Sequence, residues 1–217
     1  MTYGGAPRDL SRLLTNGYEV RTGEYLVRGW ELLRAQPGIL IGFAALQFAL
    51  GLMIALIPSA RIATSANIAI SVIQPALNAG FFIVAYKQAQ GEPVEFSDCF
   101  RGFERFGTFF GAGLVTGLLI LGGLMLCIIP GVFLGVGYVF TPLVIIDQNL
   151  GFWPAMQTSL KVVTKRFFPM LGFCLVLGLL NFGGFLLCCV GLLLTLPLTY
   201  CALTVAYLDI MNQGIQS

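Results

Sequence analysis

The chain has 217 residues, of which 57% are hydrophobic and only 10% are charged, and its formal net charge is +2. Soluble domains carry about 25% charged residues. This composition, with a mean hydropathy of +0.87, therefore excludes an ordinary soluble domain and predicts a membrane protein. The sequence holds no long basic run, so nothing in it indicates a nucleic-acid partner.

Residues 1–23 combine glycines, a proline and scattered charges, without the apolar core and cleavage site of a signal peptide. Such a composition is typical of a loosely ordered chain end. We therefore expect residues 1–23 to form a flexible cytoplasmic tail.

Six apolar runs follow, and each is expected to form a transmembrane helix because about 20 apolar residues cross a bilayer. They pair into three hairpins that turn near Pro58, Pro130 and Val190. The fourth run is short, so its helix is expected to extend through Pro130-Gly131 or to include Gln148. The runs comprise residues 38–58, 66–86, 108–129, 132–146, 168–190 and 191–208.

A short amphipathic segment precedes each hairpin. In the first, Glu24, Arg28 and Glu31 fall on one face and apolar residues on another. In the second, Ser97 is the expected N-cap, and a stripe of phenylalanines lies opposite Asp98. Aromatic side chains beside a charged face are typical of helices that lie along lipid headgroups. Each segment is therefore expected to form an interfacial elbow.

These elements recur along the chain. Arg28-Gly29-Trp30-Glu31 is echoed by Arg101-Gly102-Phe103-Glu104, and Gly122-Gly123, Cys127, Tyr138 and Asp147 are echoed by Gly183-Gly184, Cys188, Tyr200 and Asp209. The predicted fold is an all-α polytopic membrane protein with six transmembrane helices, arranged as three repeats of an amphipathic interfacial helix plus a transmembrane hairpin. The repeats are expected to cover residues 24–90, 91–147 and 148–212 of a single membrane domain, 24–212, followed by a cytoplasmic tail, 213–217.

Charge distribution predicts the orientation. Eleven of the twelve Lys and Arg residues and all ten acidic residues fall on one side of the predicted spans, and only Arg61 falls on the other. Because loops rich in Lys and Arg stay in the cytoplasm, we expect a multi-pass protein of the bacterial inner membrane with both termini and all three elbows inside. Cys99 is expected to face the cytoplasm as a reduced thiol and to resist labelling from outside.

The sequence offers little for catalysis. It contains no histidine, which excludes His-based acid/base chemistry, Ser-His-Asp and Cys-His nucleophiles, and His metal sites. No carboxylate pair lies within a span, which disfavours a proton pathway. The six cysteines show no C-x-x-C spacing. We therefore expect no catalytic residue, no cofactor and no metal site, and hence no enzyme.

Six basic residues near the predicted interface are candidate contacts for anionic lipid headgroups, where each Lys or Arg contributes about 1 kcal/mol. The alternative is that these charges only set the topology. They are Arg28, Arg101, Arg105, Lys161, Lys165 and Arg166.

Two further groups of polar residues each have two interpretations. Gln47, Asn78 and Asn181 either line a polar cavity or, as we expect by default, form hydrogen bonds between helices. Asp147 and Asp209 occupy matching places in two repeats. They are either solvated helix ends or functional carboxylates, which accept hydrogen bonds from an elbow or hold a cation together.

Three G-x-x-x-G spacings, at Gly107–Gly111, Gly113–Gly117 and Gly131–Gly135, permit close approach of helices. We expect them to serve packing within the chain. A homo-oligomer face is the alternative.

One set of residues resembles a known family. It comprises Arg28-Gly29-Trp30-Glu31-Leu32-Leu33, Pro37, Gly42, Pro142-Leu143-Val144, Asp147, Gly151, Ala155, Ser159, Lys161, Gly191, Thr195, Pro197, Tyr207 and Asp209. The pattern resembles a family of uncharacterised bacterial six-span membrane proteins, which carries a domain-of-unknown-function label. That family is more distantly similar to the membrane domain attached to some glycerophosphodiester phosphodiesterases. The resemblance covers most of residues 24–212 and implies the architecture but no activity.

Two function classes remain. The first is a non-enzymatic membrane component that contacts the bilayer and binds anionic lipid or another membrane protein through its elbows. The alternative is a small-molecule or lipid transporter built on hairpin repeats. Pro75, Pro142 and Pro197 are candidate helix breaks for the alternative.

Overall fold

The computed structural model describes residues 18–126, 128–187 and 191–216, and these residues form helices and no strands. Six of the described helical segments are long and apolar enough to cross a membrane. The all-α polytopic prediction is therefore confirmed. The helices are α2 (Thr22–Ala35), α3 (Pro37–Ala55), α4 (Ala60–Ala89), η1 (Phe96–Arg105), α5 (Phe106–Leu126), α6 (Ile128–Gly137), α7 (Thr141–Gln148), α8 (Phe152–Lys165), α9 (Phe167–Leu186) and α10 (Leu192–Gln216).

The fourth span extends in both expected directions, from Ile128 to Gln148. Pro130 lies in the first turn of α6, where its missing N–H has no partner to lose. The hairpin therefore turns before Ile128, earlier than the sequence predicts. The chain leaves the helix after Gly137 and re-enters it at Thr141, with Pro142 in the first turn of α7.

The other two prolines behave differently from Pro142. α4 continues through Pro75 and α10 continues through Pro197. Of the three candidate breaks, only the one at Pro142 interrupts a described helix. α10 also runs on to Gln216, through residues that the sequence assigns to the C-terminal tail.

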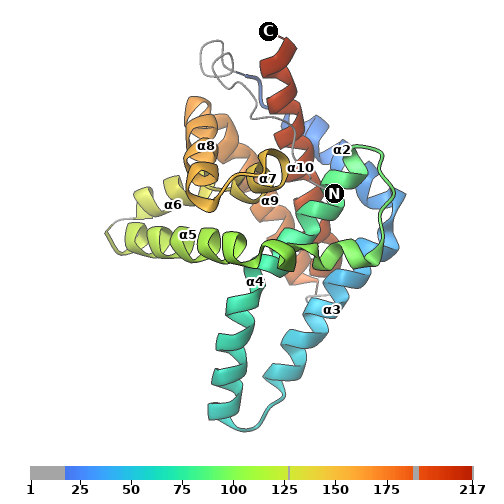
Figure 1. Ribbon diagram of the computed structural model, residues 1–217, viewed down its shortest axis with the longest axis vertical. Coiled ribbons are helices and arrows are strands. Elements are labelled where there is room, and N and C mark those ends of the chain that lie inside the picture. The colour runs from blue at the N-terminus through green and yellow to red at the C-terminus, as the bar shows by residue number, and fades with distance from the viewer. Residues whose placement is uncertain (1–17, 127, 188–190, 217) are drawn as a thin grey trace.

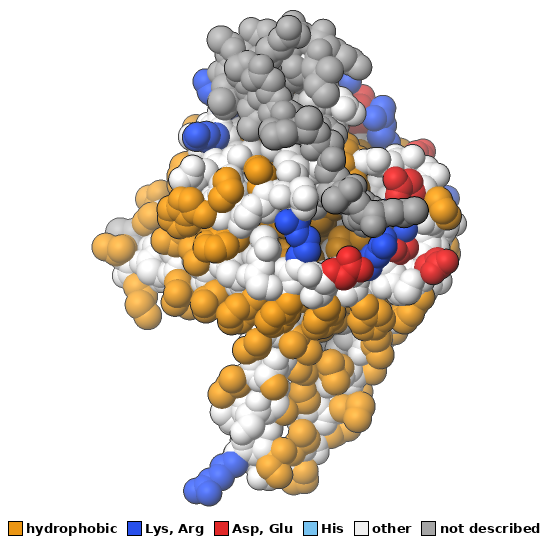
Figure 2. Space-filling view, in the orientation of Figure 1, with side chains coloured by type: hydrophobic (Ala, Val, Ile, Leu, Met, Phe, Trp, Pro, Cys, Tyr) orange, Lys and Arg blue, Asp and Glu red, His pale blue; other side chains and the backbone are white. Residues whose placement is uncertain are grey.

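The α3–α4 and α5–α6 hairpins point in different directions from the middle of the molecule (Figure 1). In Figure 1 the α3–α4 hairpin points down, while the α5–α6 hairpin runs to the left. Apolar side chains near the hairpin tips are highly exposed, with Met125 at 88%, Leu56 at 72% and Leu187 at 71%. Figure 2 shows apolar side chains covering the lower arm, with charged side chains gathered above it. The tips are therefore built to contact lipid.

The second helix of each hairpin forms the core. In the spans formed by α4, α6–α7 and α10, 50%, 44% and 56% of the most apolar window is buried. The corresponding values for the spans of α3, α5 and α9 are 22%, 17% and 22%. We call α4, α6–α7 and α10 the returning helices. They meet one another in the centre, and the outgoing helices lie around them.

The second and third elbows, η1 and α8, each pack on the returning helix that precedes them in the chain. The first elbow, α2, packs on the last returning helix, α10. A Cβ at Gly29 of α2 would lie 2.9 Å from the Ala202 backbone of α10, and a Cβ at Gly102 of η1 would lie 2.1 Å from the Ala76 carbonyl oxygen of α4. In α8, the Ser159 hydroxyl donates to the Gly137 carbonyl of α6 at 2.7 Å. The two glycines of the repeated Arg-Gly-aromatic-Glu motif are therefore contact points.

The second elbow differs from its prediction. η1 is a 3₁₀ helix whose N-cap is Glu95, in a capping box with Asp98, and Ser97 lies inside the helix. Asp98 is buried at 4% exposure instead of facing solvent. Cys99 is fully buried, so its thiol does not face solvent, and its place on the cytoplasmic side stays a prediction. Resistance of Cys99 to labelling would therefore reflect burial and not topology.

Part of the predicted flexible tail is ordered. Tyr18 is 4% exposed, and its hydroxyl donates to the Val162 carbonyl of α8 at 3.0 Å. The Glu19 amide donates to the Gln213 side chain at 2.9 Å. These two hydrogen bonds hold the end of the segment against α8 and α10. Residues 1–17, together with Cys127, Cys188 and the turn at Val190, lie outside the described residues.

Some small residues of the spans make contacts within the chain, although nothing lies within 4 Å of a Cβ at Gly107 or Gly117 of the G-x-x-x-G spacings. Gly113 faces Pro75 of α4, and Gly123 of α5 faces Gly131 of α6. Gly184 of α9 likewise faces Gly191, where α10 begins. The α5–α6 and α9–α10 hairpins are therefore both closed by a glycine pair near the tip.

Adding a methyl group at the elbow contact should destabilise the fold. Gly102→Ala would place Cβ against the Ala76 carbonyl oxygen, so we expect a loss of about 1–3 kcal/mol in the free energy of unfolding. Gly107→Ala is the matched control, because nothing lies within 4 Å of its Cβ position. Chemical unfolding in detergent measures both variants. Equal stabilities would contradict the close contact.

Candidate functional site

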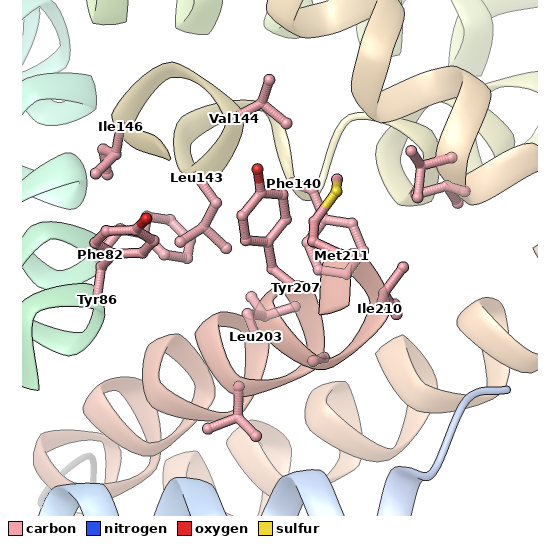
Figure 3. Close-up of a cluster of buried hydrophobic side chains, with 14 of the residues drawn as sticks. Phe82, Tyr86, Phe140, Leu143, Val144, Ile146, Leu203, Tyr207, Ile210 and Met211 are labelled. Carbon is pink, nitrogen blue, oxygen red and sulfur yellow. The ribbon is translucent and has the colours of Figure 1, made fainter. Parts of the chain in front are cut away.

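A single carboxylate joins the three returning helices. Asp147, near the end of α7, is 2% exposed. The Tyr86 hydroxyl of α4 donates to one of its oxygens, and the Tyr207 hydroxyl of α10 donates to the other at 2.8 Å. Figure 3 shows Tyr86 entering from α4 and Tyr207 rising from α10 with its hydroxyl oxygen toward α7. We call this cluster the Asp147 centre.

The surroundings of the Asp147 centre explain why it needs both tyrosines. Leu143, Val144 and Ile146 of α7 are buried around it, as is Phe140. A carboxylate removed from water is costly unless hydrogen bonds replace its hydration. The cluster therefore fixes α4 and α10 against α7. Asp147 is therefore not a solvated helix end, which was one of its two interpretations.

Asp209 has a different set of partners. It accepts hydrogen bonds from the Tyr25 hydroxyl of α2 at 2.8 Å and from the Gln213 amide at 2.6 Å. Burial raises the pKa of the Tyr25 phenol, and the hydrogen bond to Asp209 raises it further, so Tyr25 remains a protonated donor. Asp209 thus holds an elbow helix, one of the two predicted roles. The structure shows Asp147 and Asp209 bonded separately.

Two of the six candidate basic residues have structural partners. Arg101 pairs with Asp98 at 3.2 Å and with Glu104 at 3.4 Å, and Asp98 also pairs with Lys87 at 2.8 Å. Arg105 donates to the carbonyls of Ile145 and Asn149 at 3.3 and 3.4 Å. A cation at the C-terminal carbonyls of a helix is stabilising. Arg101 and Arg105 therefore hold η1 and α7 in place.

Arg28 lies among acidic groups. It is 3.9 Å from Glu24, and it lines a pocket of about 430 Å³ with Glu31, Asp209 and Asn212. The two carboxylates offset its charge, so this pocket does not favour an anion.

The remaining three basic residues form an exposed group, which we call the α8 basic cluster: Lys161, Lys165 and Arg166. All three are exposed, and among the described residues none forms an ion pair. Lys161 and Lys165 are four residues apart on one face of α8, where they line a shallow groove with Leu160 and Thr164. Their charges are available to a ligand.

The three predicted amides take separate positions. Asn181 of α9 donates to Thr199 of α10 at 2.8 Å, so it bonds between helices. The Gln47 amide nitrogen is buried without a partner among the described residues. Asn78 accepts from Gln74 at 3.2 Å, within α4, and lines a cavity. The cavity interpretation therefore fits Asn78 and the default interpretation fits Asn181.

That cavity has a volume of about 330 Å³ and lies between α4, α5, α7 and α10. Pro75 and Gly113, where α4 and α5 touch, both belong to its lining, and Asn78 and Phe82 extend that lining along α4. Thr141 and Pro142, at the start of α7, close one side. We call it the α4–α5 cavity.

Comparison with protein-family models, with curated proteins and with solved structures finds no match for this chain. The resemblance to the uncharacterised six-span family stays a prediction.

Sequence reasoning missed several residues that these sites depend on. Tyr86 and Tyr207 each lie at the predicted inner end of an apolar run, which is an ordinary place for tyrosine at a membrane interface. The short spacing between Tyr207 and Asp209 did not indicate a site, because the two side chains form hydrogen bonds with different residues. Thr141 was not singled out either, although it directly precedes a candidate helix break.

Removing one donor at the Asp147 centre should cost more than removing one at Asp209. Tyr207→Phe leaves a buried carboxylate short of a charged hydrogen bond, so we expect a loss of about 1.5–3 kcal/mol in the free energy of unfolding. Tyr25→Phe removes a donor from Asp209, which is only half-buried, and should lose about 0.5–1.5 kcal/mol. Chemical unfolding in detergent measures both variants. The reverse order would show that the Asp147 centre is not the main link.

Proposed function

We propose that this protein is a non-enzymatic component of the bacterial inner membrane that binds anionic lipid headgroups through the α8 basic cluster. In this proposal both termini and all three elbows face the cytoplasm, as the eleven-to-one distribution of basic residues supports. The observation that carries the proposal is the exposure of Lys161, Lys165 and Arg166 without ion pairs in the described chain.

The position of the cluster supports a lipid as its ligand. Phe168, two residues after Arg166, is 81% exposed and begins the apolar surface of α9. The cations therefore lie immediately before the hydrocarbon region, at the level of the headgroups. Trp153 at the start of α8 is 55% exposed, and tryptophan favours the same level of the bilayer. Each cation near an anionic surface contributes about 1 kcal/mol.

The matching contacts of the elbows support the interpretation of the chain as three repeats. Gly29 and Gly102 occupy equivalent positions in the motif, and each packs on a returning helix. Since the motif is used for packing, its repetition reflects a repeated fold unit and not repeated chemistry. The third elbow, which lacks the motif, carries the available charges.

Loss of two cations should weaken anionic lipid binding. For Lys161→Gln/Lys165→Gln we expect the affinity for phosphatidylglycerol to fall about 30-fold, which corresponds to two contributions of about 1 kcal/mol each. Arg21→Gln/Arg34→Gln, at the N-cap and in the last turn of α2, is the control with the same charge change and should bind as wild type. Native mass spectrometry of the purified protein titrated with phosphatidylglycerol gives the affinities. Unchanged affinity in the α8 variant, or equal losses in both, would overturn the proposal.

A transporter built on hairpin repeats is the second candidate. The observation in its favour is the interruption between α6 and α7 beside the α4–α5 cavity, because many transporters bind substrate at interrupted helices. Among the described residues, charged side chains are missing from the lining of this cavity, so its substrate would be uncharged.

Flux through proteoliposomes tests the transporter. If the cavity is its path, Asn78→Leu should reduce flux of a neutral solute or lipid at least about tenfold, because it removes a polar group from the lining. Asn181→Leu removes a matched amide that bonds between α9 and α10 and should retain flux. Equal flux in wild type and Asn78→Leu would remove this candidate.

A further inference from the structure

The α4–α5 cavity contains a buried polar group without a partner. Thr141 is 3% exposed, and its hydroxyl has no hydrogen-bond partner among the described residues. Thr141 also lines the cavity. A buried hydroxyl without a hydrogen bond costs free energy, so the described lining does not satisfy the Thr141 hydroxyl. A ligand that accepts a hydrogen bond would satisfy it.

A second donor lies in the same lining. The Asn78 carbonyl oxygen accepts from the Gln74 amide at 3.2 Å, which leaves the Asn78 amide N–H groups to donate. The hydroxyls of Thr116, Tyr138 and Tyr200 complete the polar part of the lining. Each of these hydroxyls can donate as well as accept, and the Asn78 amide donates, so the lining can satisfy a ligand that presents acceptors.

The rest of the lining is apolar, and the cavity lies midway along a candidate membrane span. Phe82, Phe109, Ile120 and two glycines of α5, Gly113 and Gly117, supply this surface. Asn78 lies in the middle of the span Thr64–Ala89. A ligand here reaches the site through lipid, and a charged group would lack an opposite charge in the described lining.

We propose that the α4–α5 cavity binds the uncharged ester region of a glycerolipid. An ester carbonyl accepts hydrogen bonds from Thr141 and Asn78, and the adjoining acyl chain lies against the glycine face of α5. The site is separate from the α8 basic cluster and shares no lining residue with it. Either site can therefore exist without the other.

The experiment compares two short-chain lipids that differ only in the acceptor. Dioctanoylglycerol carries two ester carbonyls, whereas dioctylglycerol ether lacks them. Native mass spectrometry of the purified full chain titrated with each lipid gives the affinities. We expect wild type to bind the ester about 3- to 10-fold more tightly than the ether, since one or two neutral hydrogen bonds distinguish them. Octyl phosphate, an anionic probe for the α8 basic cluster, should not displace the ester.

Two variants locate the binding. Gly117→Leu fills the cavity, and its Cβ position has nothing within 4 Å, so it should fold and bind the ester at least about 10-fold more weakly. Gly122→Leu, on the same helix and equally unobstructed, lies outside the lining and should bind as wild type. Thr141→Val keeps the shape and removes the hydroxyl. It should bind the ester about 2- to 10-fold more weakly, with an unchanged or higher melting temperature without ligand.

The melting temperature of unliganded Thr141→Val separates a binding role from a structural one. A fall would show that the hydroxyl already has a partner in the empty protein and would overturn the proposal. Equal affinity of wild type for ester and ether, or full affinity in Gly117→Leu, would overturn it as well. If Gly117→Leu fails to fold, Thr141→Val and the lipid pair still decide the question.

Discussion

The three hairpins meet at the carboxylate of Asp147, and the arrangement of the described spans depends on how that charge is satisfied. Tyr86 and Tyr207 come from two other hairpins and occupy its two oxygens. In water these hydrogen bonds would contribute little, because solvent offers equivalent ones. In this buried position the alternative is an unsatisfied charge, so the same bonds become a strong constraint. They bring α4, α7 and α10 together at one level.

The elbows extend this constraint around the molecule. Each packs on a returning helix, and the first elbow packs on the last returning helix, so the chain closes a ring. The closure depends on small residues, since the Gly29 and Gly102 contacts leave no room for a Cβ. Asp209 strengthens the closing contact by accepting from Tyr25 of α2. Hydrogen bonds and close packing therefore act at the same end of the molecule.

The sequence predicted the elements better than it predicted their contacts. Apolar length and charge distribution gave the six spans and the elbow positions, because these properties are local. They did not give the burial of Asp147 or Asp98, since a carboxylate next to an apolar run looks the same whether it faces water or a tyrosine from another hairpin. Docking of Tyr18 on Val162 was likewise not predictable, because its partner lies 144 residues away.

The same dependence on distant contacts explains why candidate residues that look alike in the sequence have different roles in the structure. Six basic residues were equivalent in sequence, yet Arg101 and Arg105 have partners, whereas the α8 basic cluster has no ion pair with any described residue. What distinguished them was the acidic group or carbonyl end that tertiary packing placed beside each one. Among the amides, Asn78 lines a cavity, whereas Asn181 bonds between two helices. This difference depends on how the helices pack, which no local sequence pattern records.

The distribution of packing has a further consequence for how lipid acts on the fold. Polar links between hairpins concentrate at the elbow end, whereas the tips expose side chains such as Met125 and Leu56. Lipid must therefore supply the contacts that neighbouring hairpins do not. The α4–α5 cavity, which lies beside the contact of Pro75 with Gly113, is the place where a lipid can become part of the packed structure. Binding there would stabilise the spacing of two hairpins, while binding at the α8 basic cluster would act on the elbow end that holds all three.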